Sequence, residues 1–435
     1  SFIAELGLVL VSLTMLSWLL LTFAGRVGHP YDLEWMEGGM LVHGHRVLNG
    51  QGLYVPPSLD FIPYIYPPLY SWALAAFGAV FGLDYDVSRS ISLMSTLFAA
   101  AAIVKALRLE QARWGVCALA ATVFISAYDE VGSFFDLVRA DGMLIALLGW
   151  ALVAVRCGAL RSGALLLCAA FLCKHNAAIF GLPCVWWLLK EHNWAAAVRF
   201  AVWSAVPALA MTIALQLSTE GYFLTYLLGV PGGHPIVAYR LIWWTARELM
   251  EVAPALVGCG LLWLLWQLYS QRQKLNLVVL SISIGLGLTA LWIESGPHHA
   301  LWGSRHNAVL PYVIPMWIGA AFSLRKLVCF RGGNGFWLLN GLVAIAFSAL
   351  MRGHHGGFIN VLIPGVWALS IWLGLLCQQL WRSEHGAVIV LALGLTQLYY
   401  GRWELDQFLP TERDLRIGDA LVEELSAIDG EVFIP

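Results

Sequence analysis

Three carboxylates are crowded into one short polar stretch of an otherwise apolar chain. Asp32, Glu34 and Glu37 lie in the segment YDLEWME, and His43, His45 and Arg46 follow closely. A carboxylate partly withdrawn from water at a membrane edge has a raised pKa and accepts protons better near neutral pH. The pattern therefore favours a general base that acts on a hydroxyl, although each acid alone would also serve to solvate a loop.

A second set of charges has the composition of an anion site. Arg139 stands between Asp136 and Asp141, and Lys174-His175-Asn176 lies where two short apolar runs meet. A fixed arginine holds phosphate through paired hydrogen bonds, and a lysine at this depth is costly unless it pairs or reaches water. Arg139, Lys174 and His175 are thus expected to bind a phosphate, with a structural ion pair as the alternative, and Asp141 would assist or hold a cation.

Two later polar segments add basic donors. Ser304-Arg305-His306-Asn307 and Arg352-Gly353-His354-His355 loosely resemble each other, and either could neutralise a lipid phosphate or anchor the chain at the interface. We expect Arg305 and His306 beside the phosphate. The remaining candidates for an outer cavity are His43, Tyr66, His234, Arg352, His354 and His355.

The composition is that of a polytopic membrane protein. Apolar residues make up 60% of the chain and charged residues 12%, against roughly 25% charged residues in a soluble domain. The net charge of -2 is too small to attract nucleic acid, so nucleic acid is not an expected partner.

Hydropathy predicts an all-α bundle of about 13 membrane crossings over residues 1–400. Leu6 to Ala24 reads as a retained anchor, and basic residues in alternate loops mark the cytoplasmic side. The first outer loop, 25–65, is expected to carry an interfacial helix that begins near Glu37 and ends at Asn49-Gly50. To keep both acidic loops outside, the run 88–104 is interpreted as a cytoplasmic hairpin or interfacial segment, which would place Arg89 inside.

The composition changes after Tyr400. Thr411 and Asp414 resemble a helix start, a stripe of leucines follows, and Glu431 to Pro435 reads as a strand. Residues 401–435 are therefore predicted to begin a small α/β domain outside the membrane.

These motifs resemble those of the GT-C superfamily of membrane glycosyltransferases, which includes protein O-mannosyltransferases and aminoarabinose lipid A transferases. The acidic first loop, the Gly50 to Tyr54 turn, Tyr66-Pro67-Pro68-Leu69-Tyr70, FFDLVRADGML and LCKHN carry the resemblance. By position Glu37, which precedes Gly38-Gly39, matches the family's catalytic acid. Met36 stands where the family has a further acid, which leaves Glu34 as a rival and metal dependence open.

The resemblance implies inverting transfer of a sugar from a polyprenyl-phosphate donor to a glycan, lipid or protein hydroxyl. It implies a bacterial inner membrane enzyme with its site on the periplasmic side. It fixes no cofactor; if a divalent cation, Mg²⁺ or Mn²⁺, takes part, Glu37 and Asp141 are the residues expected to hold it. The alternatives are a non-catalytic subunit of the same fold and a secondary transporter, which would normally carry ionisable residues at mid-membrane.

Overall fold

The computed structural model describes residues 2–295, 305–325 and 332–430, and side chains at 295 and 305–308 are outside that description. The regular secondary structure of the described chain is helical, with no β-strand, and the one extended pairing recorded there is an isolated bridge between Ile236 and His354. Backbone groups within a bilayer must be satisfied internally, and helices of apolar residues achieve this. The all-α expectation is thus confirmed.

The first half of the chain contains nine helices of eleven residues or more in the described range. They are α1 (Phe2–Arg26), α2 (Glu37–Leu48), α3 (Leu69–Phe81), α4 (Tyr85–Leu109), α5 (Trp114–Ser126), α6 (Asp141–Arg156), α7 (Leu160–Cys173), α8 (Gly181–Glu191) and α9 (Trp194–Ser218). A 3₁₀ helix, His175–Phe180, joins α7 to α8.

The second half continues the bundle after a short irregular region. Its helices are α10 (Tyr222–Leu224), α11 (Val230–Gly232), α12 (Thr245–Glu251), α13 (Pro254–Ser270), α14 (Lys274–Ser295), α15 (Arg305–Leu324), α16 (Gly332–Gly353), α17 (Ile363–Leu380), α18 (Gly386–Tyr400) and α19 (Glu412–Ser426). Two π-helical turns, Thr225–Gly229 and Arg240–Trp244, and the 3₁₀ turns Ile359–Leu362 and Leu405–Gln407 lie between them.

Six helices of the described chain are long and apolar enough to cross a membrane, and a seventh span results if Arg240–Glu251 and Pro254–Ser270 are counted as one. That pair bends by 106°, because Pro254 opens α13 and cannot continue the preceding helix. Five shorter apolar helices accompany them. An integral membrane protein follows from these lengths, while the count of 13 crossings stays a prediction.

The interpretation of 88–104 as a hairpin or interfacial segment is wrong. These residues belong to the continuous 25-residue helix α4, which is a candidate span. The short element is α3, which ends at Phe81, and the backbone of the capping residue Gly82 takes φ of +90°, a value suited to glycine. The chain turns back at that point, so α4 begins on the same side of the bundle as the first loop, and Arg89 lies there too.

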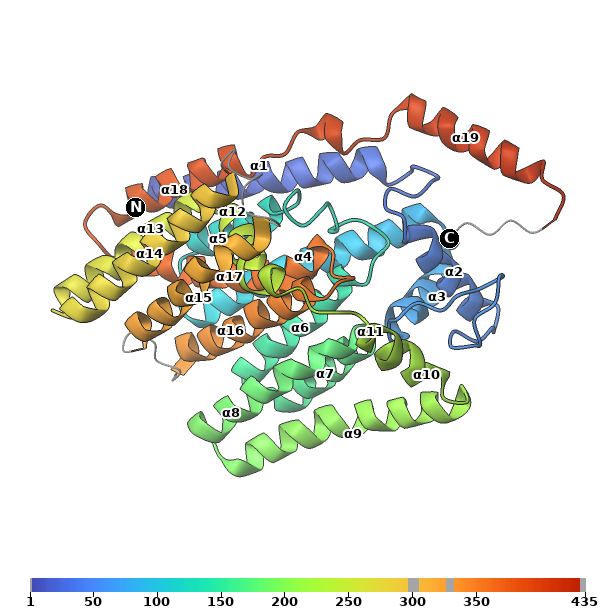
Figure 1. The fold of residues 1–435 in the computed structure, drawn as a ribbon, viewed down its shortest axis with the longest axis horizontal. Coiled ribbons are helices and arrows are strands. Elements are labelled where there is room, and N and C mark those ends of the chain that lie inside the picture. The colour runs from blue at the N-terminus through green and yellow to red at the C-terminus, as the bar shows by residue number, and fades with distance from the viewer. Residues whose placement is uncertain (1, 296–304, 326–331, 431–435) are drawn as a thin grey trace.

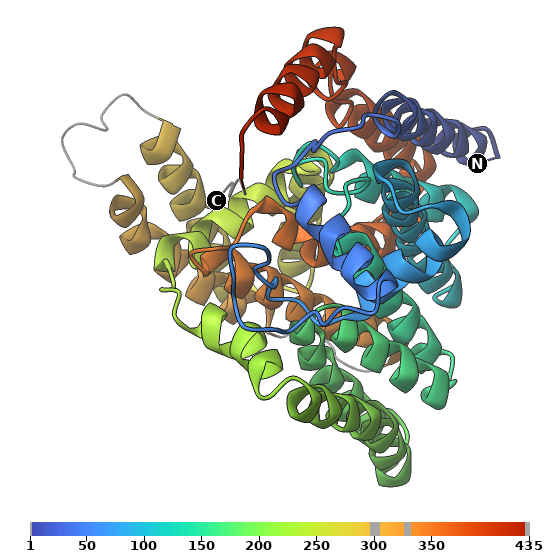
Figure 2. The same cartoon turned by 90° about the vertical axis from the view of Figure 1, so that its right-hand side faces the viewer.

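The first loop, α2 and α3 lie together at one end of the bundle, on the right in Figure 1. Figure 2 looks onto that end and shows α2 and the blue loop after it in front of the helix ends. The segment 127–140 between α5 and α6 reaches the same end, because Val138 and Arg139 contact the acids of the first loop. The buried core lies behind, where α4, α5, α6 and α17 pack around Phe124, Trp367 and their neighbours.

The helix predicted after Thr411 is present. Thr411 Oγ1 accepts a hydrogen bond from Asp414 N, and Asp414 Oδ2 accepts one from Thr411 N, which is a capping box. This helix, α19, lies outside the packed helices in Figure 1, and Asp419 on it accepts a hydrogen bond from the hydroxyl of Tyr31 in the first loop. The strand expected at Glu431 to Pro435 falls outside the described residues, so the C-terminal α/β domain stays a prediction.

Candidate functional site

Glu37 lies at the centre of the charged side chains at this end of the bundle, and its carboxylate does not face water. Its Oε2 lies 2.7 Å from Arg89 Nη2 and its Oε1 lies 3.1 Å from Arg89 Nε. The same carboxylate accepts hydrogen bonds from Leu33 N at 2.7 Å and Val138 N at 2.8 Å, and its side chain is 0% exposed. Four donors thus saturate both oxygens.

Arg89 extends this network to the end of α1. Its Nη1 donates to Arg26 O at 3.1 Å and His29 O at 2.6 Å, and its Nη2 donates to Tyr31 O at 2.7 Å. The last carbonyls of a helix lack partners within the helix, so a buried guanidinium stabilises them. Arg89 and Glu37 therefore hold α1, α2, α4 and the segment before α6 in one arrangement.

The expectation that Glu37 is the general base does not fit this geometry. A base must have a lone pair within reach of the acceptor's proton, whereas every oxygen of Glu37 is buried and already bonded to nitrogen donors. The role was assigned from the position of Glu37 in the motif. Sequence spacing does not show which of two nearby acids forms a buried ion pair. Through these contacts Glu37 links the first loop, α4 and the segment before α6.

Glu34 has a carboxylate oxygen that is available to accept a proton. Its Oε2 accepts hydrogen bonds from Arg139 Nη1 at 2.9 Å and Met36 N at 3.2 Å. Its Oε1 accepts none from the residues the structure describes, and the side chain is 12% exposed. Burial, only partly offset by the charge of Arg139, raises the pKa of Glu34 above its usual value. A raised pKa makes this group a stronger proton acceptor when ionised.

Asp32 is the second carboxylate near this place. Its Oδ1 accepts a hydrogen bond from the hydroxyl of Tyr85, the first residue of α4. Desolvation raises the pKa of Asp32, although the residue as a whole is exposed at the surface. Asp32 also lies against the first turn of α2, where a Cβ on Gly38 would stand 3.0 Å from Oδ1. Asp32 is thus anchored by α4 and α2 but open to solvent.

Tyr66 joins the arginine and the lysine of the predicted anion site. Its hydroxyl accepts a hydrogen bond from Arg139 Nη2 at 3.2 Å, and Lys174 Nζ stands 5.2 Å from the centre of its ring. Arg139 is 5.1 Å from the Phe134 ring on another side. Two cations, one from the segment before α6 and one from the junction after α7, therefore meet at the side chain of Tyr66.

Lys174 is fixed at the junction of α7 and the following 3₁₀ helix. Its Nζ donates to Asp141 Oδ1 at 2.6 Å, and Asn360 Nδ2 donates to the same oxygen at 3.0 Å. Burial disfavours the charged ammonium, but the charge of Asp141 and the hydrogen bond that Asp141 accepts outweigh this effect and raise the pKa of Lys174. The lysine stays protonated, as an anion anchor requires. Its neighbour His175 has a pKa lowered to about 4 by burial and then by Lys174, so that ring is neutral.

His43 has a structural part in the first loop. Its Nδ1 lies 2.6 Å from Gly39 O, and its Nε2 accepts a hydrogen bond from Tyr64 N at 2.9 Å. Burial lowers the pKa of His43 to about 4, and the ring stacks on Tyr64 at 4.6 Å. The histidine thus fixes the segment 61–66, which carries Tyr66, onto α2.

The other basic candidates form a neighbouring cluster. Arg352 makes a bidentate pair with Glu248, with Nη2 to Oε1 at 2.7 Å and Nε to Oε2 at 3.0 Å. The rings of His234 and His354 lie 4.8 Å apart and are tilted by 51°, and the backbone N–H of His355 donates to Pro235 O. In the described part of the chain, no hydrogen bond or ion pair links these residues to Glu34 or Arg139. Arg305 and His306 begin α15, and their side chains are outside the described part.

The carboxylates present do not fit a divalent cation. In the described residues no three His, Cys, Asp or Glu side chains gather closely enough to hold one. Glu37 is bonded by four N–H groups, and Asp141 Oδ1 is bonded by Lys174 and Asn360. Asp141 Oδ2 is buried without a partner, which leaves one oxygen where a metal needs several. Asp136 also turns away from the site, because it pairs with Arg26 at 3.4 Å.

Four contributing residues were missed from the sequence. Arg89 was assigned to the wrong side, and Tyr64, Tyr85 and Asn360 were not singled out as site residues. Tyrosines are common near membrane interfaces, so their spacing carried no signal. A signal for Arg89 was present, since a lone arginine in the first turns of an apolar helix needs a buried partner.

Comparison with known proteins gives two solved structures. No protein-family model and no curated protein matches the chain. A crystal structure of ArnT from Cupriavidus metallidurans bound to undecaprenyl phosphate aligns with 91% of this chain and 75% of its own, at 14% identity and a TM-score of 0.47. The apo structure of the same protein aligns over the same shares at 16% identity and a TM-score of 0.44.

Proposed function

We propose that this protein is a membrane glycosyltransferase that moves a sugar from a polyprenyl-phosphate donor to an acceptor hydroxyl with inversion. The observation that carries the proposal is the contact of Glu34 with Arg139, beside Tyr66 and Lys174. A mostly buried carboxylate with one unbonded oxygen thus contacts one fixed cation, Arg139, and a second, Lys174, lies against the same tyrosine ring at one edge of a membrane bundle. The resemblance of the first-loop motifs to GT-C enzymes supports the same reaction class.

The proposed reaction is a single displacement. Glu34 Oε1 takes the proton from the acceptor hydroxyl while the acceptor oxygen bonds to the anomeric carbon. The bond from that carbon to the phosphate oxygen breaks, and the electron pair leaves with the polyprenyl phosphate. One displacement inverts the anomeric centre.

Arg139 and Lys174 have a physical reason to act on the leaving group. The departing phosphate gains negative charge, and preorganised cations in a water-poor site stabilise that charge more strongly than water does. Each cation already has one carboxylate partner, Glu34 or Asp141. These partners hold the cations in place, and the remaining N–H groups are available to the phosphate.

The proposed location follows from the edge position of the site. The donor's isoprenoid tail stays in the bilayer, so its phosphate must be met where helix ends reach the interface. Arg156, Lys190 and Arg199 lie at the opposite helix ends, and the positive-inside rule favours the cytoplasm for loops that carry such residues. We therefore assign the site to the periplasmic side of a bacterial inner membrane.

The direct test uses purified protein and labelled polyprenyl-phosphate sugars. A panel of hexose, pentose and aminopentose donors is offered with lipid, glycan and peptide acceptors. We expect wild-type protein to release polyprenyl phosphate with transfer of label, and Glu34→Gln to lose that turnover. Glu191→Gln, which alters an exposed carboxylate at the other end of α8, is the matched control.

Two outcomes would contradict the proposal. Undiminished transfer by both Glu34→Gln and Asp32→Asn would remove the general base from the first loop. Absence of turnover with every donor, together with stable co-purification of a partner protein, would favour a non-catalytic subunit of the same fold.

A further inference from the structure

A cavity of about 390 Å³ opens on α4 at the end of the bundle opposite the candidate site. It is lined by Ala101, Val104, Lys105, Arg108, Leu109 and Trp114. Lys105 lies 16 residues after Arg89 along one helix, a rise of roughly 24 Å at 1.5 Å per residue. The cavity is therefore close to the membrane surface on the other side from Glu34.

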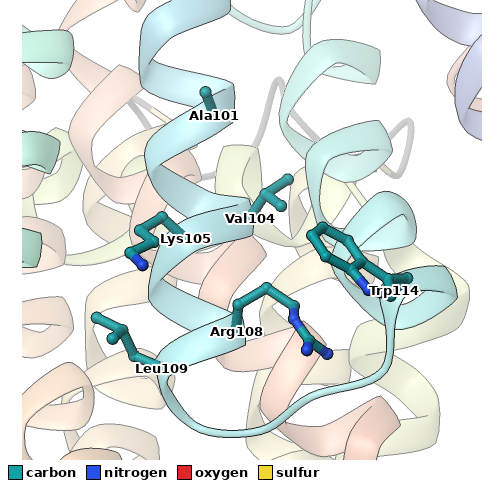
Figure 3. Close-up of a pocket in the computed structure, with 6 residues that line it drawn as sticks. All are labelled: Ala101, Val104, Lys105, Arg108, Leu109 and Trp114. Carbon is teal, nitrogen blue, oxygen red and sulfur yellow. The ribbon is translucent and has the colours of Figure 1, made fainter.

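Two cations flank this cavity. Figure 3 shows Lys105 leaving α4 on one side and Arg108 on the other, with Arg108 directed towards Trp114 of α5. The Arg108 guanidinium stands 4.5 Å from the centre of the Trp114 ring, and its Nη1 donates to Ala112 O. These contacts fix Arg108 but leave further N–H donors unused.

Among the residues that the structure describes, no acid pairs with the two cations of the cavity. Lys105 makes no hydrogen bond or ion pair with any residue in the described ranges. The adjacent acid, Glu110, already accepts from Arg156 Nε at 2.8 Å and Nη2 at 3.1 Å, and also from Trp337 Nε1 at 3.0 Å. The other nearby acid, Glu5, pairs with Arg113 at 3.0 Å. Two uncompensated cations at a membrane surface attract an anion.

The shape of the surface indicates what kind of anion. Met94, Phe98, Ala101, Lys105 and Arg108 follow one another at helical spacing, so they share one face of α4. Met94 is 53% exposed and Phe98 is 57% exposed, and both lie nearer the centre of the membrane than the two cations. An apolar strip that ends in two cations matches a molecule with an acyl chain and a phosphate, whereas free phosphate would use only the cations.

We propose that this cavity is a binding site for an anionic phospholipid of the leaflet opposite the candidate site. The lipid phosphate lies between Lys105 and Arg108, and one acyl chain lies along Ala101, Phe98 and Met94. Trp114, which is 59% exposed, is at the level of the head groups, where its ring is favoured. This site is separate from the proposed donor site, and neither depends on the other.

The test measures retained lipid by native mass spectrometry of the purified protein. The protein is titrated with phosphatidylglycerol, with phosphatidylcholine, and with phosphatidylglycerol in the presence of excess inorganic phosphate. The variant is the double substitution Lys105→Gln and Arg108→Gln. The matched control is Arg161→Gln, because Arg161 also stacks on a tryptophan, 4.2 Å from the Trp203 ring, but does not line this cavity.

We expect one phosphatidylglycerol to bind wild type and Arg161→Gln with preference over phosphatidylcholine. The double variant should bind it roughly tenfold or more weakly, since each cation near a membrane surface adds to the attraction. Equal retention by the double variant and wild type would overturn the proposal. So would an equal loss in Arg161→Gln, or full displacement of the lipid by inorganic phosphate, which would indicate a site for a free anion.

Discussion

Glu37 and Arg89 form a bidentate ion pair, at 2.7 and 3.1 Å, between a surface helix and the first turns of a candidate membrane span. Neither side chain is more than 1% exposed. Glu37 occupies the position at which the motif suggested the catalytic acid. The pair shows that two neighbouring glutamates have different surroundings. Glu37 sets the position of the loops, and Glu34 beside it has the unbonded oxygen.

Removal of the Glu37 charge should therefore lower the stability of the fold, and any loss of activity should follow from that. Glu37→Gln leaves the Arg89 guanidinium buried without a counter-charge, which costs on the order of 3–5 kcal/mol. We expect a large drop in the thermal unfolding temperature and poor recovery of monodisperse protein. Glu34→Gln, whose site is partly exposed, should unfold close to the wild-type temperature. Equal stability of both variants would show that the buried pair does not hold the loops.

Activity should depend on the protonation state of Glu34. Burial raises the pKa of Glu34. The carboxylate is therefore protonated, and inactive as a base, up to a higher pH than an ordinary glutamate would be. As pH rises through that raised pKa, kcat/KM should increase. Asp32→Asn should keep this acid limb, because Glu34 remains. If Asp32→Asn abolishes the limb while Glu34→Gln retains it, the base is Asp32, whose pKa is also raised.

The two cations should differ in how far they tolerate substitution. Lys174→Gln leaves Asp141 buried with only Asn360 as a donor, and it removes a positive charge from the proposed phosphate site. We expect kcat to fall about 100-fold or more, since loss of one preorganised donor commonly costs that much. Arg139→Lys keeps the charge but loses the fork that contacts Glu34 and Tyr66. It should retain measurable turnover, which Arg139→Gln should lack. Steady-state kinetics with a saturating acceptor distinguishes the variants.

The close approach of α2 to the segment 61–66 should make Gly39 intolerant of a side chain. A Cβ at Gly39 would stand 1.8 Å from the Tyr64 hydroxyl, whereas a Cβ at Gly28 would meet nothing within 4 Å. Gly39→Ala should displace Tyr64 and, with it, Tyr66 from Arg139. We expect a loss of turnover in Gly39→Ala and wild-type turnover in Gly28→Ala. Similar activity of the two variants would mean that Tyr66 is not required to organise the cations.

Much of the architecture is determined by the sequence alone. Long apolar runs in a chain with few charges must bond their backbone N–H and C=O groups internally, and helices do this within one segment. The all-α membrane class therefore follows from composition. Thr411 and Asp414 likewise define the start of α19, because a capping box is made by residues three apart in the chain. The acids near Glu34 and the cations Arg139 and Lys174 were identified by residue type and by their positions between apolar runs.

The pairing of those charges was decided only by the tertiary structure. Glu34 and Glu37 are three residues apart and chemically alike, yet Glu37 meets Arg89 and Glu34 meets Arg139. The difference arises because the chain turns back at Gly82, after α3. This turn brings the start of α4 into contact with the first loop. Such contacts join residues far apart in the chain, and their geometry depends on how short helices pack rather than on local spacing. Sequence pattern therefore located the charged residues, and packing selected which carboxylate stays available.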